Sequence, residues 1–160
     1  MPESSPSQLI NDWVIAAKSA TPNNAPSVAK TIAGFYTSDA VLCATEGIIK
    51  NQPNPPNILA DYEQNFEAGW VLTGISNQSV NPGGTGQHWA WAYGQWTGTV
   101  PNPNPNPPSG EPKILQLQGC WSILFANQST SAEPNWLIQQ HTIVTNPLPP
   151  DPLIPPQSAR

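Results

Sequence analysis

A proline-rich segment, PNPNPNPPSGEP at residues 101–112, constrains the fold more than any other part of the sequence. Proline has no backbone N–H group to donate to a neighbouring strand, so this segment cannot lie inside a β-sheet. We predict an exposed loop with an extended, polyproline-II-like backbone. The segments on either side predict two long strands, over residues 87–99 and 114–126. A third strand is predicted over residues 136–145, and strands joined by turns pair antiparallel.

The first half of the chain has helical periodicity instead. Apolar residues recur at helical spacing between residues 9 and 20, which predicts a helix from Gln8 with Ser7 as its N-cap. Ser27 can cap a second helix that runs to Tyr36, and Asn57 a third over residues 58–67. A short strand over residues 40–44 and a looser one over 70–80 are also expected, and NPGGTG at residues 81–86 predicts a turn.

This order of elements predicts an α+β fold. Three N-terminal helices should pack on a curved, mostly antiparallel sheet that forms a cone with a pocket at its mouth. We expect a single domain over residues 8–147 that includes the loop at 101–112. Residues 1–7 should form a flexible tail and residues 148–160 a proline-rich tail.

Charged residues make up only 9% of the chain, against roughly 25% in ordinary domains. The formal net charge is −5 and the only arginine is Arg160, so the chain lacks the cations that nucleic-acid phosphates require. No apolar run reaches the roughly 18 residues of a membrane helix. The N-terminus has no basic start and no long apolar region, which favours the cytoplasm, although low charge would also suit an extracytoplasmic or acidic setting.

Two cysteines and two histidines are candidate reactive side chains. Cys43 and Cys120 lie far apart without CxxC spacing, and we interpret them as buried thiols in a reducing compartment, with a disulfide as the alternative. His88 and His141 are the candidate general acids or bases, because the pKa of histidine is nearest to neutral pH. Two histidines without a third ligand at usable spacing do not predict a zinc site, and we expect no cofactor.

Aromatic residues are concentrated in GQHWAWAYGQWTGTV, residues 86–100. Strand alternation assigns His88 and Trp96 to one face, and Trp89, Trp91 and Tyr93 to the other. We predict that both faces of this strand are covered, because an exposed aromatic patch is unusual in a monomer.

Alternation along the last strand leaves the pocket face undecided. It groups His141 with Leu137, Gln139 and Ile143, and it groups Gln140 with Thr142 on the other side. Both sides are partly apolar, so periodicity does not say which side lines the pocket.

Several segments resemble the nuclear transport factor 2-like superfamily. They are WVIAA at residues 13–17, VAKTIAGFYTSDAVLCAT at 28–45, ILADYEQNF at 58–66 and WLIQQHTIVTNP at 136–147. The superfamily includes polyketide cyclases, ketosteroid isomerases and the association domain of calcium/calmodulin-dependent kinase II. The resemblance implies a cone-shaped pocket and a homodimer that pairs through the sheet.

Within the superfamily, the pattern is most similar to iota-class carbonic anhydrases. The resemblance implies that Thr45 and Tyr62 would bind bicarbonate and that His141 would transfer protons. The family pattern continues after this histidine with His-Ser-Ser, where this sequence has Thr142, Ile143 and Val144.

We therefore predict a small-molecule-binding protein whose ligand is mostly neutral and apolar. It should be a homodimer that binds neither nucleic acid nor membranes. The alternatives are a lyase or isomerase that uses His141 or His88, and an oligomeric assembly module. The predicted ligand-binding residues are Thr45, Tyr62, Trp96, Gln118, Cys120, Gln140 and Thr142.

Overall fold

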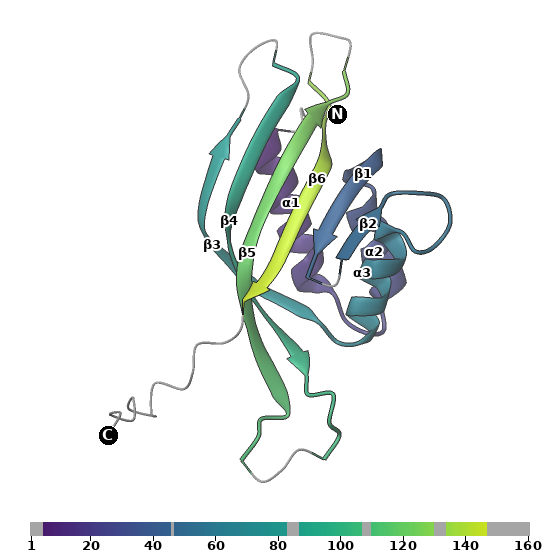
Figure 1. Cartoon of the computed structure of the whole chain (residues 1–160), viewed down its shortest axis with the longest axis vertical. Coiled ribbons are helices and arrows are strands. Elements are labelled where there is room, and N and C mark those ends of the chain that lie inside the picture. Colours follow the sequence, from purple (N-terminus) through teal and green to yellow (C-terminus); the bar gives the residue numbers. More distant parts are fainter. Residues whose placement is uncertain (1–4, 46, 83–86, 107–109, 130–133, 147–160) are drawn as a thin grey trace, which may run out of the picture.

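The computed structural model describes residues 5–45, 47–82, 87–106, 110–129 and 134–146 (Figure 1). Three helices and six strands follow one another in these described residues. They are α1 (Pro6–Ser19), α2 (Ala25–Ala33), β1 (Tyr36–Ala44), β2 (Gly47–Lys50), α3 (Ile58–Glu67), β3 (Val71–Asn81), β4 (Trp89–Pro101), β5 (Ile114–Asn127) and β6 (Trp136–Asn146).

The strands form one curved sheet in the order β2-β1-β6-β5-β4-β3. All neighbouring pairs are antiparallel except β1 and β6, which run parallel. Helix α1 packs against β3, β4 and β6. Helix α2 packs against α3, which contacts β2 (Figure 1). β4 and β5 extend past the other strands as a hairpin that ends in the proline-rich loop (Figure 1). The predicted α+β architecture is thus confirmed.

Side-chain capping hydrogen bonds mark the starts of α1 and α3. Asn57 caps α3 as predicted, since its side-chain oxygen accepts the Ala60 N–H at 2.8 Å. The other two predicted caps are wrong. Ser5 caps α1 by accepting the Gln8 N–H at 3.1 Å, and Asn24, not Ser27, occupies the N-cap position of α2.

Proline accounts for both errors. Pro6 and Pro26 lie in the first turns of α1 and α2, where the missing N–H group has no helical partner to lose. Both helices therefore start before the predicted positions, and α1 includes two residues assigned to the N-terminal tail. α2 also ends at Ala33, so that β1 begins at Tyr36 instead of Ala40.

The predicted alternation along β6 is wrong at its centre because of a β-bulge. Phe125 pairs with Ile138, but Leu124 pairs with Gln140, so Gln139 is an extra residue in β6. The insertion reverses the alternation, and His141 joins Ile138 on the face that the helices cover. We call this the inner face, and the opposite side of the sheet the outer face.

The aromatic stripe of β4 lies on the outer face. Trp89, Trp91 and Tyr93 are 54%, 45% and 49% exposed, while Ala92 and Trp96 on the inner face are buried. The predicted grouping of these residues is confirmed. Among the described residues of the single chain, none supplies the predicted cover for these three side chains.

Some predictions fall on residues outside the described part of the chain. These are residues 1–4, residues 83–86 of the predicted turn, residues 107–109 of the loop, residue 147 at the predicted end of the domain, and residues 148–160 of the C-terminal tail. At the base of the proline-rich loop, next to β4 and β5, the Asn102 N–H donates to the Lys113 carbonyl at 2.8 Å.

Candidate functional site

A cavity of about 230 Å³ lies between α3 and the inner face of the sheet. Four strands and one helix contribute to it, with apolar and aromatic side chains over most of the wall. The lining residues are Leu42, Ala44, Thr45, Asp61, Tyr62, Asn65, Ala68, Trp70, Trp96, Val100, Leu117, Ile143 and Thr145.

Trp96 is part of the apolar wall, and glycines leave room for its indole. A Cβ atom added at Gly119 would lie 2.6 Å from the Trp96 ring nitrogen, and one at Gly98 would lie 3.2 Å from its Cζ3. The indole N–H donates to the Val144 carbonyl at 3.3 Å. Trp70 packs against this ring with a centroid distance of 6.0 Å, so two indoles border the cavity together.

The polar lining residues come from three elements. Thr45 follows β1, and its hydroxyl oxygen accepts the backbone N–H of Thr145 in β6 at 3.1 Å. Asp61 and Asn65 lie four residues apart on α3, and therefore on one side of the helix. The Asn65 amide donates to the Asp61 carboxylate at 3.3 Å and to the Asp61 carbonyl at 2.9 Å. Among the described lining residues, Asp61 alone is charged at neutral pH.

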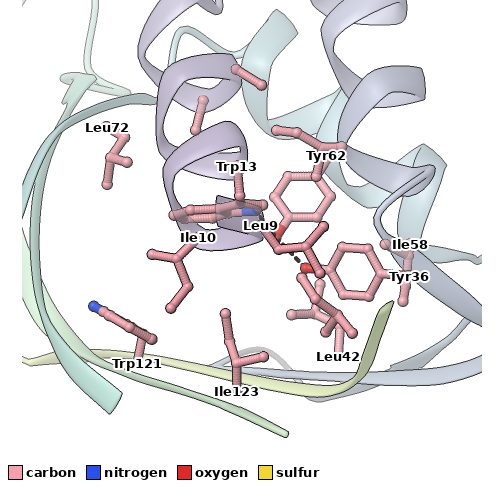
Figure 2. Packing of buried hydrophobic residues seen from close by; sticks show 14 of the residues in the cluster. Leu9, Ile10, Trp13, Tyr36, Leu42, Ile58, Tyr62, Leu72, Trp121 and Ile123 are labelled. Atoms are coloured by element: carbon pink, nitrogen blue, oxygen red, sulfur yellow. Dashed lines mark hydrogen bonds between the residues drawn. The ribbon is translucent and has the colours of Figure 1, made fainter. Parts of the chain in front are cut away.

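A buried hydrogen-bond network lies behind the cavity. The Trp13 indole N–H donates to the Tyr62 hydroxyl at 3.3 Å, and the hydroxyls of Tyr62 and Tyr36 are 2.8 Å apart. The Tyr36 hydroxyl is 2.6 Å from Nδ1 of His141. Figure 2 shows Trp13 from α1 and Tyr62 from α3 converging on Tyr36 from β1. Tyr62 also lines the cavity, so it connects the two regions.

The donors and acceptors of the network define its direction. An indole N–H can only donate, so the Tyr62 oxygen accepts from Trp13. If Tyr62 then donates to Tyr36 and Tyr36 to His141, both hydroxyls accept and donate. This arrangement places the imidazole proton on Nε2, which has no hydrogen-bond partner in the described part of the chain. The opposite direction would require a further acceptor for the Tyr62 proton, so we favour the first.

Burial keeps all three titratable groups of this network neutral. It lowers the pKa of His141 from 6.5 to about 3, because the charged imidazolium would lose its hydration. Burial is also the main cause that raises the pKa of Tyr36 and of Tyr62 above 10.0. At neutral pH, His141 is therefore an uncharged imidazole.

The structure brings together three of the predicted ligand-binding residues, Thr45, Tyr62 and Trp96, at the cavity. Gln140, Thr142 and Cys120 instead border shallow hollows on the outer face, and Gln118 is absent from the cavity lining. These four residues alternate with inner-face residues of β5 and β6, so they cannot reach the cavity.

Neither histidine lies at the cavity. His141 is fully buried and borders a tight crevice beneath α1 with Trp13 and Trp121. His88 is exposed just before β4 and lies outside the cavity lining. The interpretation of both cysteines as buried thiols is also wrong, because Cys43 is half-buried and Cys120 is exposed, and both are free.

The predicted ligand-binding residues did not include Asp61, Asn65, Trp70 or Thr145, which all line the cavity. The spacing of Asp61 and Asn65 around Tyr62 on α3 is a signal in the sequence that could have identified both as lining residues. Asp61 lies one residue before Tyr62 and Asn65 three residues after it, so both lie on an adjacent side of the helix. Assigning Tyr62 to the pocket therefore predicts that both residues lie near the pocket. Thr145 could not be found in this way, since the bulge in β6 reverses the faces before it.

Among the described residues, no helix has the length and apolar character that a bilayer span requires. The same residues contain no cluster of three or more His, Cys, Asp or Glu side chains that could hold a metal ion.

Solved structures of other proteins share this arrangement. A protein of unknown function with a cystatin-like fold from Nostoc punctiforme is 13% identical, with a TM-score of 0.55 over 90% of each chain. LinA is 12% identical, with a TM-score of 0.61 over 88% of this chain and 82% of its own. The yeast UBP3-associated protein BRE5 is 12% identical, with a TM-score of 0.56 over 86% of this chain and 90% of its own.

These similarities, together with others to proteins described as NTF2-like, show that the chain has the nuclear transport factor 2-like fold. No protein-family model matches the sequence, and no curated protein sequence matches it at a significant level. At these identities the similarity establishes the fold alone.

Proposed function

We propose that this protein binds a small organic ligand in the cavity between α3 and the sheet. The observation that carries the proposal is the lining itself, in which apolar and aromatic walls are combined with a few polar groups. Such a combination is typical of ligand pockets, where polar groups orient a mostly apolar molecule. The volume of about 230 Å³ is below the roughly 300–1,000 Å³ of pockets for drug-sized ligands, which favours a one-ring compound.

A cavity-filling variant tests this proposal. Ala44→Leu adds a larger side chain to the cavity wall, whereas Ser38→Leu adds the same side chain at an exposed position of the same strand. We expect a panel of one-ring compounds, screened by ligand-observed NMR, to bind the wild type and Ser38→Leu but not Ala44→Leu. Binding that survives unchanged in a folded Ala44→Leu variant would place the ligand elsewhere.

We also propose that a second copy of the chain covers the outer face. Trp89, Trp91 and Tyr93 expose a contiguous aromatic stripe there, and Trp91 and Tyr93 stack at a centroid distance of 5.7 Å. The described residues that border the two adjacent hollows carry no charge, so a self-complementary contact meets no repulsion. An exposed patch of this kind commonly marks an interaction surface.

Light scattering after size exclusion tests the dimer. The wild type should have twice the mass of one chain, and Trp91→Glu should shift it to the monomer, because a charge in an apolar interface is poorly solvated. Ile15→Glu, a change at an exposed apolar residue of α1, should leave the mass unchanged. A monomeric wild type would contradict both the dimer and an assembly module.

A lyase of the carbonic anhydrase type is a second candidate function. The observation that favours it is the network from Tyr62 at the cavity to His141, a possible path for protons. The Asp61 carboxylate and the lack of lysine, arginine or histidine among the described lining residues disfavour a bicarbonate anion. Stopped-flow measurement of carbon dioxide hydration tests it, and a rate equal to that of buffer would exclude it.

A further inference from the structure

Three polar groups in the wall of the cavity already donate to partners within the protein. The Asn65 amide donates to the Asp61 carbonyl at 2.9 Å and to its carboxylate at 3.3 Å. The Trp96 indole N–H donates to the Val144 carbonyl, and the Tyr62 hydroxyl belongs to the buried network. The hydrogens of these groups are therefore directed at the protein itself and not at a ligand.

The Thr45 hydroxyl differs, because its oxygen has a partner and its hydrogen does not. β1 makes its last pair with β6 at Cys43, opposite Thr142, so the backbone N–H of Thr145 lies beyond the pairing of these two strands. The hydroxyl oxygen of Thr45, in the turn after β1, accepts this N–H at 3.1 Å. The hydroxyl hydrogen must therefore point away from the Thr145 nitrogen, and it has no acceptor within the described part of the chain.

A second hydroxyl lies next to it on β6. Thr145 is half-buried, its side chain lines the same cavity, and its hydroxyl has no hydrogen-bond partner among the described residues. The bond from the Thr145 backbone to Thr45 keeps the two residues together. The two threonines therefore offer two hydroxyl hydrogens at one place in the cavity wall.

The rest of the wall suits an apolar and uncharged body. Leu42, Trp96 and Ile143 line the cavity from β1, β4 and β6. The described lining contains no lysine, arginine or histidine that could neutralise an anion. A ligand oxygen that leaves water for such a wall needs hydrogen-bond donors, since an unpaired polar group is costly to bury. A carbonyl oxygen suits the two threonines because it has two lone pairs, one for each hydroxyl, and no hydrogen of its own.

We propose that the ligand is an uncharged one-ring compound with a carbonyl oxygen, and that this oxygen accepts hydrogen bonds from Thr45 and Thr145. The ring packs against the apolar wall that Leu42, Trp96 and Ile143 help to form. This inference rests on the proposed function of the cavity, and it adds the polar group that orients the ligand.

Acetophenone and ethylbenzene test the inference, because they have nearly the same size and differ in the carbonyl oxygen. NMR titration of the isotope-labelled protein gives a Kd for each compound and shows whether the shifted signals come from cavity residues. In Thr45→Val the side chain keeps its shape but loses the hydroxyl. We expect this variant to bind acetophenone about fivefold more weakly, within the range of one neutral hydrogen bond, and ethylbenzene within about twofold of the wild type.

Two further variants control for effects on the fold. Thr45→Val also loses the bond to the Thr145 N–H, but a general disturbance of the wall would weaken the binding of both compounds alike. Thr45→Ser keeps the hydroxyl, so its affinity for acetophenone should stay within about twofold of the wild type. Thr97→Val removes a hydroxyl at an exposed position of β4 outside the cavity lining, and should change neither affinity.

The outcomes separate this inference from the function on which it rests. If Thr45→Val weakens the binding of both compounds equally, or of neither, the carbonyl anchor is overturned and the cavity remains a binding site. A loss of acetophenone affinity in Thr45→Ser as large as in Thr45→Val would also overturn it. If neither compound binds at the cavity while another one-ring compound does, the inference fails alone. If no one-ring compound binds there, the proposed function fails as well.

Discussion

Mild acid should destabilise this protein through His141. The folded state holds the imidazole neutral, with a pKa of about 3 instead of 6.5, because burial removes the water that would solvate its charge. The unfolded chain takes up a proton as the pH falls through about 6.5, whereas the folded chain does not until about pH 3. The stability that depends on the neutral ring is therefore complete above pH 6.5 and is lost progressively below it.

The size of the effect follows from the difference between these two pKa values. Linkage predicts a loss of about 2 kcal/mol in the free energy of unfolding between pH 7.5 and pH 5.0. Carboxylates contribute little in this interval, since those of an unfolded chain titrate near pH 4. A loss of this size lowers the urea midpoint by roughly 1 M for a chain of this length.

Urea unfolding at the two pH values, followed by tryptophan fluorescence, measures the loss. His141→Asn removes the titration but keeps a side-chain atom near Nδ1 for the Tyr36 hydroxyl, so its stability should change little with pH. His88→Asn, at an exposed position, is the matched control and should keep the full loss. NMR titration of the two imidazoles gives an independent reading if His141→Asn does not fold. A flat wild-type profile, or a resonance of His141 that titrates near pH 6.5, would refute the argument.

Three further substitutions test the packing described above by urea or thermal unfolding. Tyr36→Phe removes the hydroxyl that bonds to His141, so we expect a loss of about 1–3 kcal/mol at pH 7.5, and a loss below about 0.5 kcal/mol would contradict the buried network. Asn57→Ala removes the N-cap of α3 and should cost about 1 kcal/mol, unless solvent replaces the cap without loss. Gly119→Ala drives a Cβ atom into the carbonyl oxygen of Val144, and should cost about 3 kcal/mol or more; a wild-type melting temperature would contradict this close approach.

Local signals in the sequence were sufficient for most of the fold. Asn57 and the periodicity after it predicted α3 with the observed bounds. The proline-rich segment separates β4 from β5 as predicted, except that its first residue, Pro101, ends β4 and pairs with Ile114. The sequence did not reveal β2, a strand of four residues, or the parallel pairing of β1 with β6. Both depend on contacts between distant segments, which periodicity within a short window cannot contain.

The site was harder to predict because two non-local features determine which face a residue occupies. Of the residues predicted to bind a ligand, Thr45, Tyr62 and Trp96 line the cavity. Thr142 and Gln140 do not, because the helices cover only the inner face and the bulge at Gln139 decides which residues lie there. Nothing in the sequence around Gln139 distinguishes the bulge from regular strand, since no glycine or proline occurs between residues 136 and 146.

The position of His141 determines how experiments on this site must be interpreted. Its ring supports Tyr36, which supports Tyr62, and Tyr62 belongs to both the network and the cavity wall. A substitution at His141 is therefore expected to weaken ligand binding through α3, even if the imidazole never contacts a ligand. Loss of binding in such a variant would not identify a catalytic residue. Asp61 lies on the same helix and lines the cavity, so its substitution examines the cavity more directly.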